Sequence, residues 1–184
     1  MTRFHGLLVG FRVVVLDPGE ATLLYNSGFY GKPLGVAKPR PGERLEAPLE
    51  LDLIEAVYLA EKGLLEVRDA EGRVLGAEEL SEWAGRAVQR FRQLYLVYRD
   101  LRDSGLVVRS GMKFGADFSV YYKGPGLEHA PYLVQVLSYR EDINPLDLVR
   151  AGRLSHSVRK RLLIAAIDEE TKRITYIMLK WSKP

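Results

Sequence analysis

Three side chains in the second half of the chain could together cut a phosphodiester bond. Tyr121 ends an apolar run, His129 follows a Gly-Pro-Gly loop, and Lys160 directly precedes another apolar run. When an internal 2′-hydroxyl attacks its own phosphate, one group must accept a proton, a second must protonate the leaving 5′-oxygen, and a cation must stabilise the phosphorane. Tyrosine, histidine and lysine suit these tasks without a metal ion. The alternative interpretation is a surface histidine beside a packing tyrosine.

The elements around these residues predict a mixed sheet. The run 114–122 is expected to be a strand that ends at Tyr121. The runs 132–137 and 162–167 are almost continuously apolar, which is typical of central strands. Asn144-Pro145 is expected to start a helix between them, with proline at the first helical position. Strands that alternate with helices in this way predict an α/β domain.

The first half predicts a smaller α+β domain. Residues 7–16 are expected to form a strand that ends at the Asp17-Pro18-Gly19 turn, and Ala21–Tyr25 a second short strand. Residues 49–63 carry a helical apolar stripe that ends at a glycine. Residues 76–99 are expected to be helical, with a core face formed by five residues: Leu80, Trp83, Ala87, Phe91 and Leu94.

The fold class predicted from these patterns is α/β, with a small N-terminal α+β domain over residues 1–88 and a C-terminal α/β domain with a mixed sheet over residues 89–184. Between the strands and helix of the first half, residues 28–48 hold four prolines and several basic residues, including Lys38. A loop of this length is unusual in a compact domain, and is either functional or a disordered insert.

Charge differs between the halves. Residues 1–94 hold 12 basic and 14 acidic side chains, whereas residues 95–184 hold 15 and 10. The densest basic stretch, Arg150 to Arg161, includes Lys160 and contains no acid. A basic second half indicates a polyanion partner, and an ordinary solvated surface is the alternative.

Composition excludes several classes of protein. The chain has no cysteine, which excludes disulfide scaffolds, thiolate metal sites and a cysteine nucleophile. The longest aliphatic run, Leu162–Ile167, is too short to span a bilayer, and no secretory signal is visible, so a cytoplasmic protein is expected. A metal-dependent nuclease remains possible with Asp117 as its first acid, but the strand that should supply the E-x-K pair reads LVQVL at 133–137.

Four segments of the second half resemble the catalytic domain of the tRNA-intron (splicing) endonuclease family, in the same order and spacing. They are Tyr98–Gly105 (YRDLRDSG), Gly111–Tyr121 (GMKFGADFSVY), His129–Val134 (HAPYLV), and Arg153 with Ser157–Lys160 (SVRK). The first half resembles the archaeal N-terminal domain of the same family, through Tyr25-Asn26, residues 28–31 and residues 51–59. Within this family, the chain resembles archaeal catalytic subunits of the crenarchaeal type.

The resemblance implies a restriction-endonuclease-like catalytic domain that cuts precursor tRNA at bulge-helix-bulge splice sites, without a metal ion or other cofactor. Tyr121 would be the general base, His129 the general acid and Lys160 the cation that stabilises the transition state. The expected products carry a 2′,3′-cyclic phosphate and a 5′-hydroxyl. Tyr122 is the alternative to Tyr121, but strand alternation turns it to the opposite face. His156 is the alternative to His129, but it is expected to be packed or solvated at a helix end.

The resemblance also implies RNA-binding residues and a partner. Arg153 and Trp181 would hold a flipped bulge base by stacking, although Trp181 could instead pack in an interface. Lys38 would contact RNA from a loop, 31–44, that resembles an insertion of crenarchaeal catalytic subunits. The expected assembly is an α2β2 heterotetramer with a structural subunit, with a homotetramer as the alternative; the turn 168–170 and the last strand would make its contacts. A non-catalytic subunit of the same assembly is the competing hypothesis.

Overall fold

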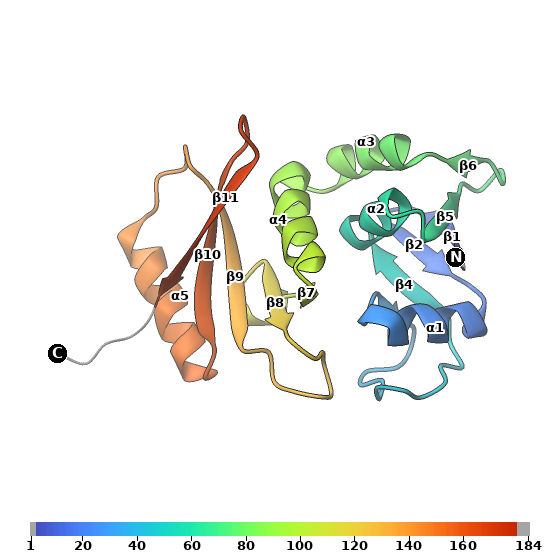
Figure 1. The fold of residues 1–184 in the computed structure, drawn as a ribbon, viewed down its shortest axis with the longest axis horizontal. Coiled ribbons are helices and arrows are strands. Elements are labelled where there is room, and N and C mark those ends of the chain that lie inside the picture. Colours follow the sequence, from blue (N-terminus) through green and yellow to red (C-terminus); the bar gives the residue numbers. More distant parts are fainter. Residues whose placement is uncertain (1–2, 180–184) are drawn as a thin grey trace. The chain divides into compact units, whose positions relative to one another are not determined.

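The computed structural model describes residues 3–179, which divide into two units between Arg92 and Gln93. This division lies within helix α4 (Phe91–Asp103), close to the expected limit at residue 88. Each unit contains a mixed β-sheet with its own helices (Figure 1). Among the residues described, no helix combines the length and apolarity that crossing a membrane would require.

The N-terminal unit is built on a six-stranded sheet with the strand order β3-β4-β2-β1-β5-β6. Strand β1 pairs antiparallel with β2 and parallel with β5, so the sheet is mixed. The strands are β1 (Phe4–Val9), β2 (Arg12–Val15), β3 (Lys32–Pro33), β4 (Leu49–Asp52), β5 (Leu65–Arg68) and β6 (Val74–Leu75), and the helices are α1 (Pro18–Gly28), α2 (Leu53–Glu61) and α3 (Ala77–Ala87).

The strand predicted at Ala21–Tyr25 is wrong, because this segment belongs to helix α1. The Asp17-Pro18 pair starts a helix here: the Asp17 carboxylate accepts a hydrogen bond from the Glu20 backbone N–H at 2.7 Å, and Pro18 occupies the first turn. Ala21, Leu24 and Tyr25 then form its buried face. Proline after aspartate suits a turn and a helix start equally, and burial of this face favours the helix.

The helix predicted over residues 76–99 is interrupted. Helix α3 ends at Ala87 and α4 begins at Phe91, with Arg90 in a left-handed conformation between them (φ 59°). Trp83, expected in the core, is 44% exposed. The buried stripe of α3 is formed by Leu80 and Ala84, and Trp83 lies about 100° round the helix from Ala84.

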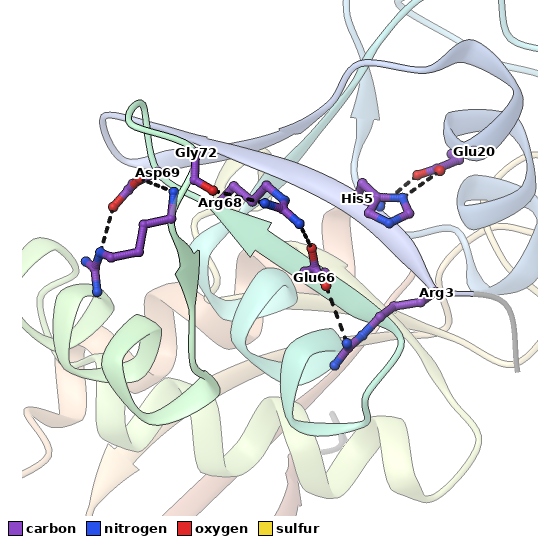
Figure 2. A network of polar contacts seen from close by, with 8 residues as sticks. Arg3, His5, Glu20, Glu66, Arg68, Asp69 and Gly72 are labelled. Carbon is purple, nitrogen blue, oxygen red and sulfur yellow. Dashed lines mark hydrogen bonds and ion pairs between the residues drawn. The ribbon is translucent and has the colours of Figure 1, made fainter.

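Ion pairs hold many basic side chains of the N-terminal unit. Figure 2 shows Glu66 between two arginines, with its carboxylate 3.4 Å from Arg3 and 2.6 Å from Arg68. In the same view, the imidazole of His5 lies 2.8 Å from the carboxylate of Glu20. The Arg3–Glu66 pair joins the residue before β1 to β5, and the His5–Glu20 pair joins β1 to α1.

The C-terminal unit contains a five-stranded sheet with the order β11-β10-β9-β8-β7. Its strands are β7 (Val107–Ser110), β8 (Phe118–Tyr121), β9 (Tyr132–Ser138), β10 (Arg161–Asp168) and β11 (Arg173–Leu179). Strands β9 and β10 are parallel and the other pairs antiparallel. Helix α5 (Pro145–Ser157) forms the crossover between the parallel strands and begins at an Asn144 cap, as predicted. The mixed sheet and the α/β class are therefore confirmed.

Helices α4 and α5 cover opposite faces of this sheet (Figure 1). On the α4 face, the rings of Tyr98 and Phe118 lie 6.0 Å apart, and the Tyr176 hydroxyl donates a hydrogen bond to Asp100 at 2.7 Å. On the other face, a cavity of about 410 Å³ lies between α5 and the side chains of Leu162 and Ile164. The sheet is thus the middle layer of the C-terminal unit.

Candidate active site

Strand directions bring Tyr121, His129 and Lys160 to one edge of the C-terminal sheet. Tyr121 is the last residue of β8, His129 lies in the loop that leads into β9, and Lys160 directly precedes β10. Because β8 runs antiparallel to β9 whereas β10 runs parallel to it, the end of β8 and the starts of β9 and β10 share an edge. Residues far apart in sequence therefore meet at this edge, which we call the catalytic edge.

The ammonium group of Lys160 is held in place by two contacts. Its Nζ donates a hydrogen bond to the Ala130 carbonyl at 2.8 Å and lies 5.0 Å from the centre of the Phe114 ring. Since Ala130 follows His129 directly, the hydrogen bond ties the lysine to the histidine loop. Burial, and then the nearby charge of Lys113, lower the pKa of Lys160.

Two adjacent tyrosines are directed differently. The half-buried Tyr121 lies on the same face of β8 as Ser119. Ser119 pairs with Leu133 of β9, and Leu133 pairs with Leu162 of β10, which faces α5. Tyr121 is therefore on the α5 side of the sheet. Tyr122 is exposed, and its hydroxyl lies 2.7 Å from that of Tyr132. This hydrogen bond raises the pKa of Tyr122 and lowers that of Tyr132.

Residues 122–131 form an ordered loop that carries His129. The Glu128 carboxylate accepts a hydrogen bond from the Lys123 backbone N–H at 2.6 Å, and the Gly124 carbonyl accepts one from the Glu128 N–H at 3.2 Å. His129 itself is exposed, and its side chain has no hydrogen-bond or ion-pair partner within residues 3–179. Its ring is therefore accessible for proton transfer to a bound molecule.

Arg153 lies beside Lys160. Both residues line a cavity of about 320 Å³ between α5 and the adjoining ends of β10 and β11, together with His156, Arg161 and Leu179. Arg153 is exposed, one turn before the end of α5. The cavity thus presents several basic side chains next to the catalytic edge.

The other two predicted RNA-binding residues are not brought to this edge by the structure. Trp181 lies outside the described residues. Lys38 is exposed in the loop between β3 and β4 of the N-terminal unit.

The sequence analysis did not single out Phe114 or Lys113 as site residues. They belong to a short 3-10 turn (Met112–Phe114) between β7 and β8. The Lys113 ammonium lies 5.3 Å from the centre of the Phe114 ring, which Lys160 also contacts. The only signal in the sequence was that both residues lie in the segment 111–121 on which the resemblance rests.

Asp117, considered above as a metal ligand, forms a hydrogen bond to a strand of the sheet. Its carboxylate accepts a hydrogen bond from the Val136 backbone N–H at 2.7 Å. Within residues 3–179, no group of three histidine or carboxylate side chains is arranged to hold a metal ion.

Comparison with known proteins gives a consistent result for both halves. A family model described as the catalytic C-terminal domain of tRNA intron endonuclease matches residues 91–176. A second model, described as the N-terminal domain of tRNA intron endonuclease, matches residues 4–81.

Similar proteins match over almost their whole length. A tRNA-splicing endonuclease from Hyperthermus butylicus is 56% identical over 180 residues, which are 98% of this chain and 99% of the relative. tRNA-splicing endonucleases from Saccharolobus islandicus and Saccharolobus solfataricus are 49% and 50% identical over 177 residues, which are 96% of this chain and 97% of each relative.

Proposed function

Because this chain belongs to the tRNA-intron endonuclease family, we propose that it is a catalytic subunit that cuts precursor tRNA at bulge-helix-bulge splice sites. Both halves match the family, and the relatives are tRNA-splicing endonucleases. The observation that carries the proposal is the meeting of Tyr121, His129 and Lys160 at one sheet edge, beside a cavity lined by Arg153.

In the proposed mechanism, Tyr121 accepts the proton of the 2′-hydroxyl, whose oxygen forms a bond to the adjacent phosphorus. The bond from phosphorus to the 5′-oxygen breaks, and His129 donates a proton to that oxygen. The Lys160 ammonium stabilises the charge of the phosphorane. The products are a 2′,3′-cyclic phosphate and a 5′-hydroxyl. Anchoring of Lys160 to the Ala130 carbonyl supports this arrangement, since it keeps the cation next to the proton donor.

Recognition of the bulge is proposed to depend on stacking. Arg153 and Trp181 would enclose a flipped base between two planar groups, which tolerates any base and therefore suits recognition of RNA shape. Lys38 would add a phosphate contact from its exposed loop. The position of Arg153 on the wall of a basic cavity supports its part in this proposal.

For the assembly, we favour an α2β2 heterotetramer with a structural subunit, working in the cytoplasm. Strand β11 is an edge of its sheet, and Ile177 and Met178 are 46% and 47% exposed there. An exposed apolar edge strand is suited to pairing with another chain. The acidic turn Asp168–Glu170 would dock on a basic groove of a neighbour. Size measurement of the chain expressed alone tests this: a fully active homotetramer would contradict it.

The activity is tested by incubating an intron-containing precursor tRNA with the chain, with and without a candidate partner subunit, in excess EDTA. Cleavage at both splice sites with 2′,3′-cyclic phosphate and 5′-hydroxyl ends is expected. Loss of cleavage in EDTA would instead favour the metal-dependent nuclease. The Lys160→Met variant tests the competing hypothesis. If an assembly that contains this variant still cuts the RNA, and its partner subunit is active alone, the result would favour this chain being a non-catalytic subunit.

A further inference from the structure

Two lysines, Lys160 at the catalytic edge and Lys113 in the turn before β8, share one aromatic ring. The ammonium groups of Lys113 and Lys160 lie 5.3 and 5.0 Å from the centre of the Phe114 ring. Attraction to the ring offsets part of the cost of holding an ammonium there, but it leaves each positive charge intact. The ring thus positions two cations close together.

Neither lysine is neutralised. Within residues 3–179, no carboxylate forms an ion pair with Lys113 or Lys160. The proximity is felt electrostatically, since the charge of Lys113 contributes, after burial, to lowering the pKa of Lys160. Like charges held together without a counter-ion are unfavourable in the free protein and become favourable when an anion binds.

We propose that Lys113 is a second phosphate-binding residue of the catalytic site, which contacts the phosphate next to the scissile one in the bound RNA strand. This inference rests on the proposed function, because it takes Lys160 as the residue at the scissile phosphate. Successive phosphates of one strand present two negative charges in a row, and the ammonium groups of Lys113 and Lys160 both lie near the Phe114 ring. Lys113 then draws the strand into register with Tyr121 and His129.

The test uses the chain assembled with its partner subunit and a bulge-helix-bulge RNA that carries a 2′-deoxy nucleotide at each attacking position, so that it binds without being cut. Affinity is measured over a range of salt concentrations, and cleavage is measured separately with the all-ribose RNA. The variants are Lys113→Met and Lys113→Arg. The control is Lys62→Met, because Lys62 lies 5.3 Å from the centre of a tyrosine ring, Tyr58, in the N-terminal unit.

Log affinity falls linearly with the logarithm of the salt concentration, and loss of one phosphate contact makes this slope less steep by roughly 0.7 to 0.9. We expect this decrease and a fall of about tenfold in kcat/KM for Lys113→Met, recovery of both in Lys113→Arg, and no change in Lys62→Met. Equal slopes for Lys113→Met and the control would overturn the proposal, even if cleavage were slower. RNA that binds but is not cut by the unaltered protein would contradict the proposed function alone, and the slopes would still decide the role of Lys113. An unaltered protein that neither binds nor cuts would overturn both.

Discussion

Many basic side chains of the N-terminal unit form ion pairs with carboxylates, whereas the lysines and arginine at and beside the catalytic edge of the C-terminal unit do not. Glu66 joins two arginines, and Arg73 contacts Asp69 at 3.1 Å and Glu79 at 2.8 Å. In the described part of the catalytic edge, Lys113, Lys160 and Arg153 have no such partner. An arginine or lysine that is already paired gains little from a phosphate, so the unpaired cations mark where a polyanion gains most.

The largest effect is expected at the catalytic edge itself, from two adjacent tyrosines that differ in where their hydroxyl groups are directed. Tyr121→Phe is expected to reduce cleavage by about 10²-fold or more, because it removes the oxygen proposed to accept the proton. Tyr122→Phe is the matched control, since the Tyr122 hydroxyl is directed to Tyr132. Single-turnover cleavage of bulged RNA measures both variants. A large loss in Tyr122→Phe with normal cleavage in Tyr121→Phe would reverse the assignment.

A carboxylate added next to Lys113 should make the surroundings of this lysine resemble the N-terminal unit. Met112 is 83% exposed and precedes Lys113. Met112→Glu is expected to weaken RNA binding about fivefold at low salt, which corresponds to about 1 kcal/mol for one added surface charge. Met112→Gln, similar in size and uncharged, should bind as the unaltered protein does. Equal affinities for the two variants would show that the edge does not depend on a surplus of positive charge.

Away from the catalytic edge, the carboxylate of Asp100 in the C-terminal unit accepts a hydrogen bond from an uncharged side chain. The Tyr176 hydroxyl donates to it, and burial followed by this hydrogen bond raises the pKa of Tyr176. Because the folded-state pKa exceeds the unfolded value of about 10, the contribution to stability is complete below pH 10 and decreases above it. Tyr176→Phe should cost about 1 kcal/mol at neutral pH.

Urea unfolding between pH 7 and 11 measures the effect of Tyr176→Phe. The variant should lose less stability at alkaline pH than the unaltered protein does. Parallel curves for the two proteins would show that this hydroxyl does not stabilise the fold through Asp100.

The smallest effect is expected from unpairing the arginines of the N-terminal unit. Glu66→Gln removes the charge between Arg3 and Arg68. Exposed ion pairs contribute little, so the free energy of unfolding should fall by less than about 1 kcal/mol. RNA cleavage should stay unchanged. A clear gain in RNA affinity would mean that these arginines, once released, also reach the substrate.

The sequence predicted the parts of the fold in which one signal dominates. The apolar runs at 132–137 and 162–167 became β9 and β10, and the Asn144-Pro145 pair started α5. The prediction for Ala21–Tyr25 failed because a proline after an aspartate can start a helix as readily as a turn, and only burial of the α1 face decides between them.

The sequence indicated candidate site residues but not the contacts that hold them in place. Residue types and motif order pointed to Tyr121, His129 and Lys160, and strand directions explain how they come together. The contact of Phe114 with Lys160 joins segments that are distant in sequence, and it depends on the path of a 3-10 turn for which no local pattern exists. The hydrogen bond from Lys160 to a backbone carbonyl is invisible in sequence for the same reason.

The register in which β9 pairs with β10 determines whether the hydrogen bond from Lys160 to the Ala130 carbonyl can form. Arg161 pairs with Tyr132, and its N–H donates to the Pro131 carbonyl at 2.9 Å, so Lys160 reaches Ala130 only in this register. A slip by one residue would turn every side chain of β10, with the lysine before it, to the opposite face. A chain that pairs β9 with β10 in the wrong register is therefore expected to lose cleavage activity, because the same error that disrupts its core separates Lys160 from His129.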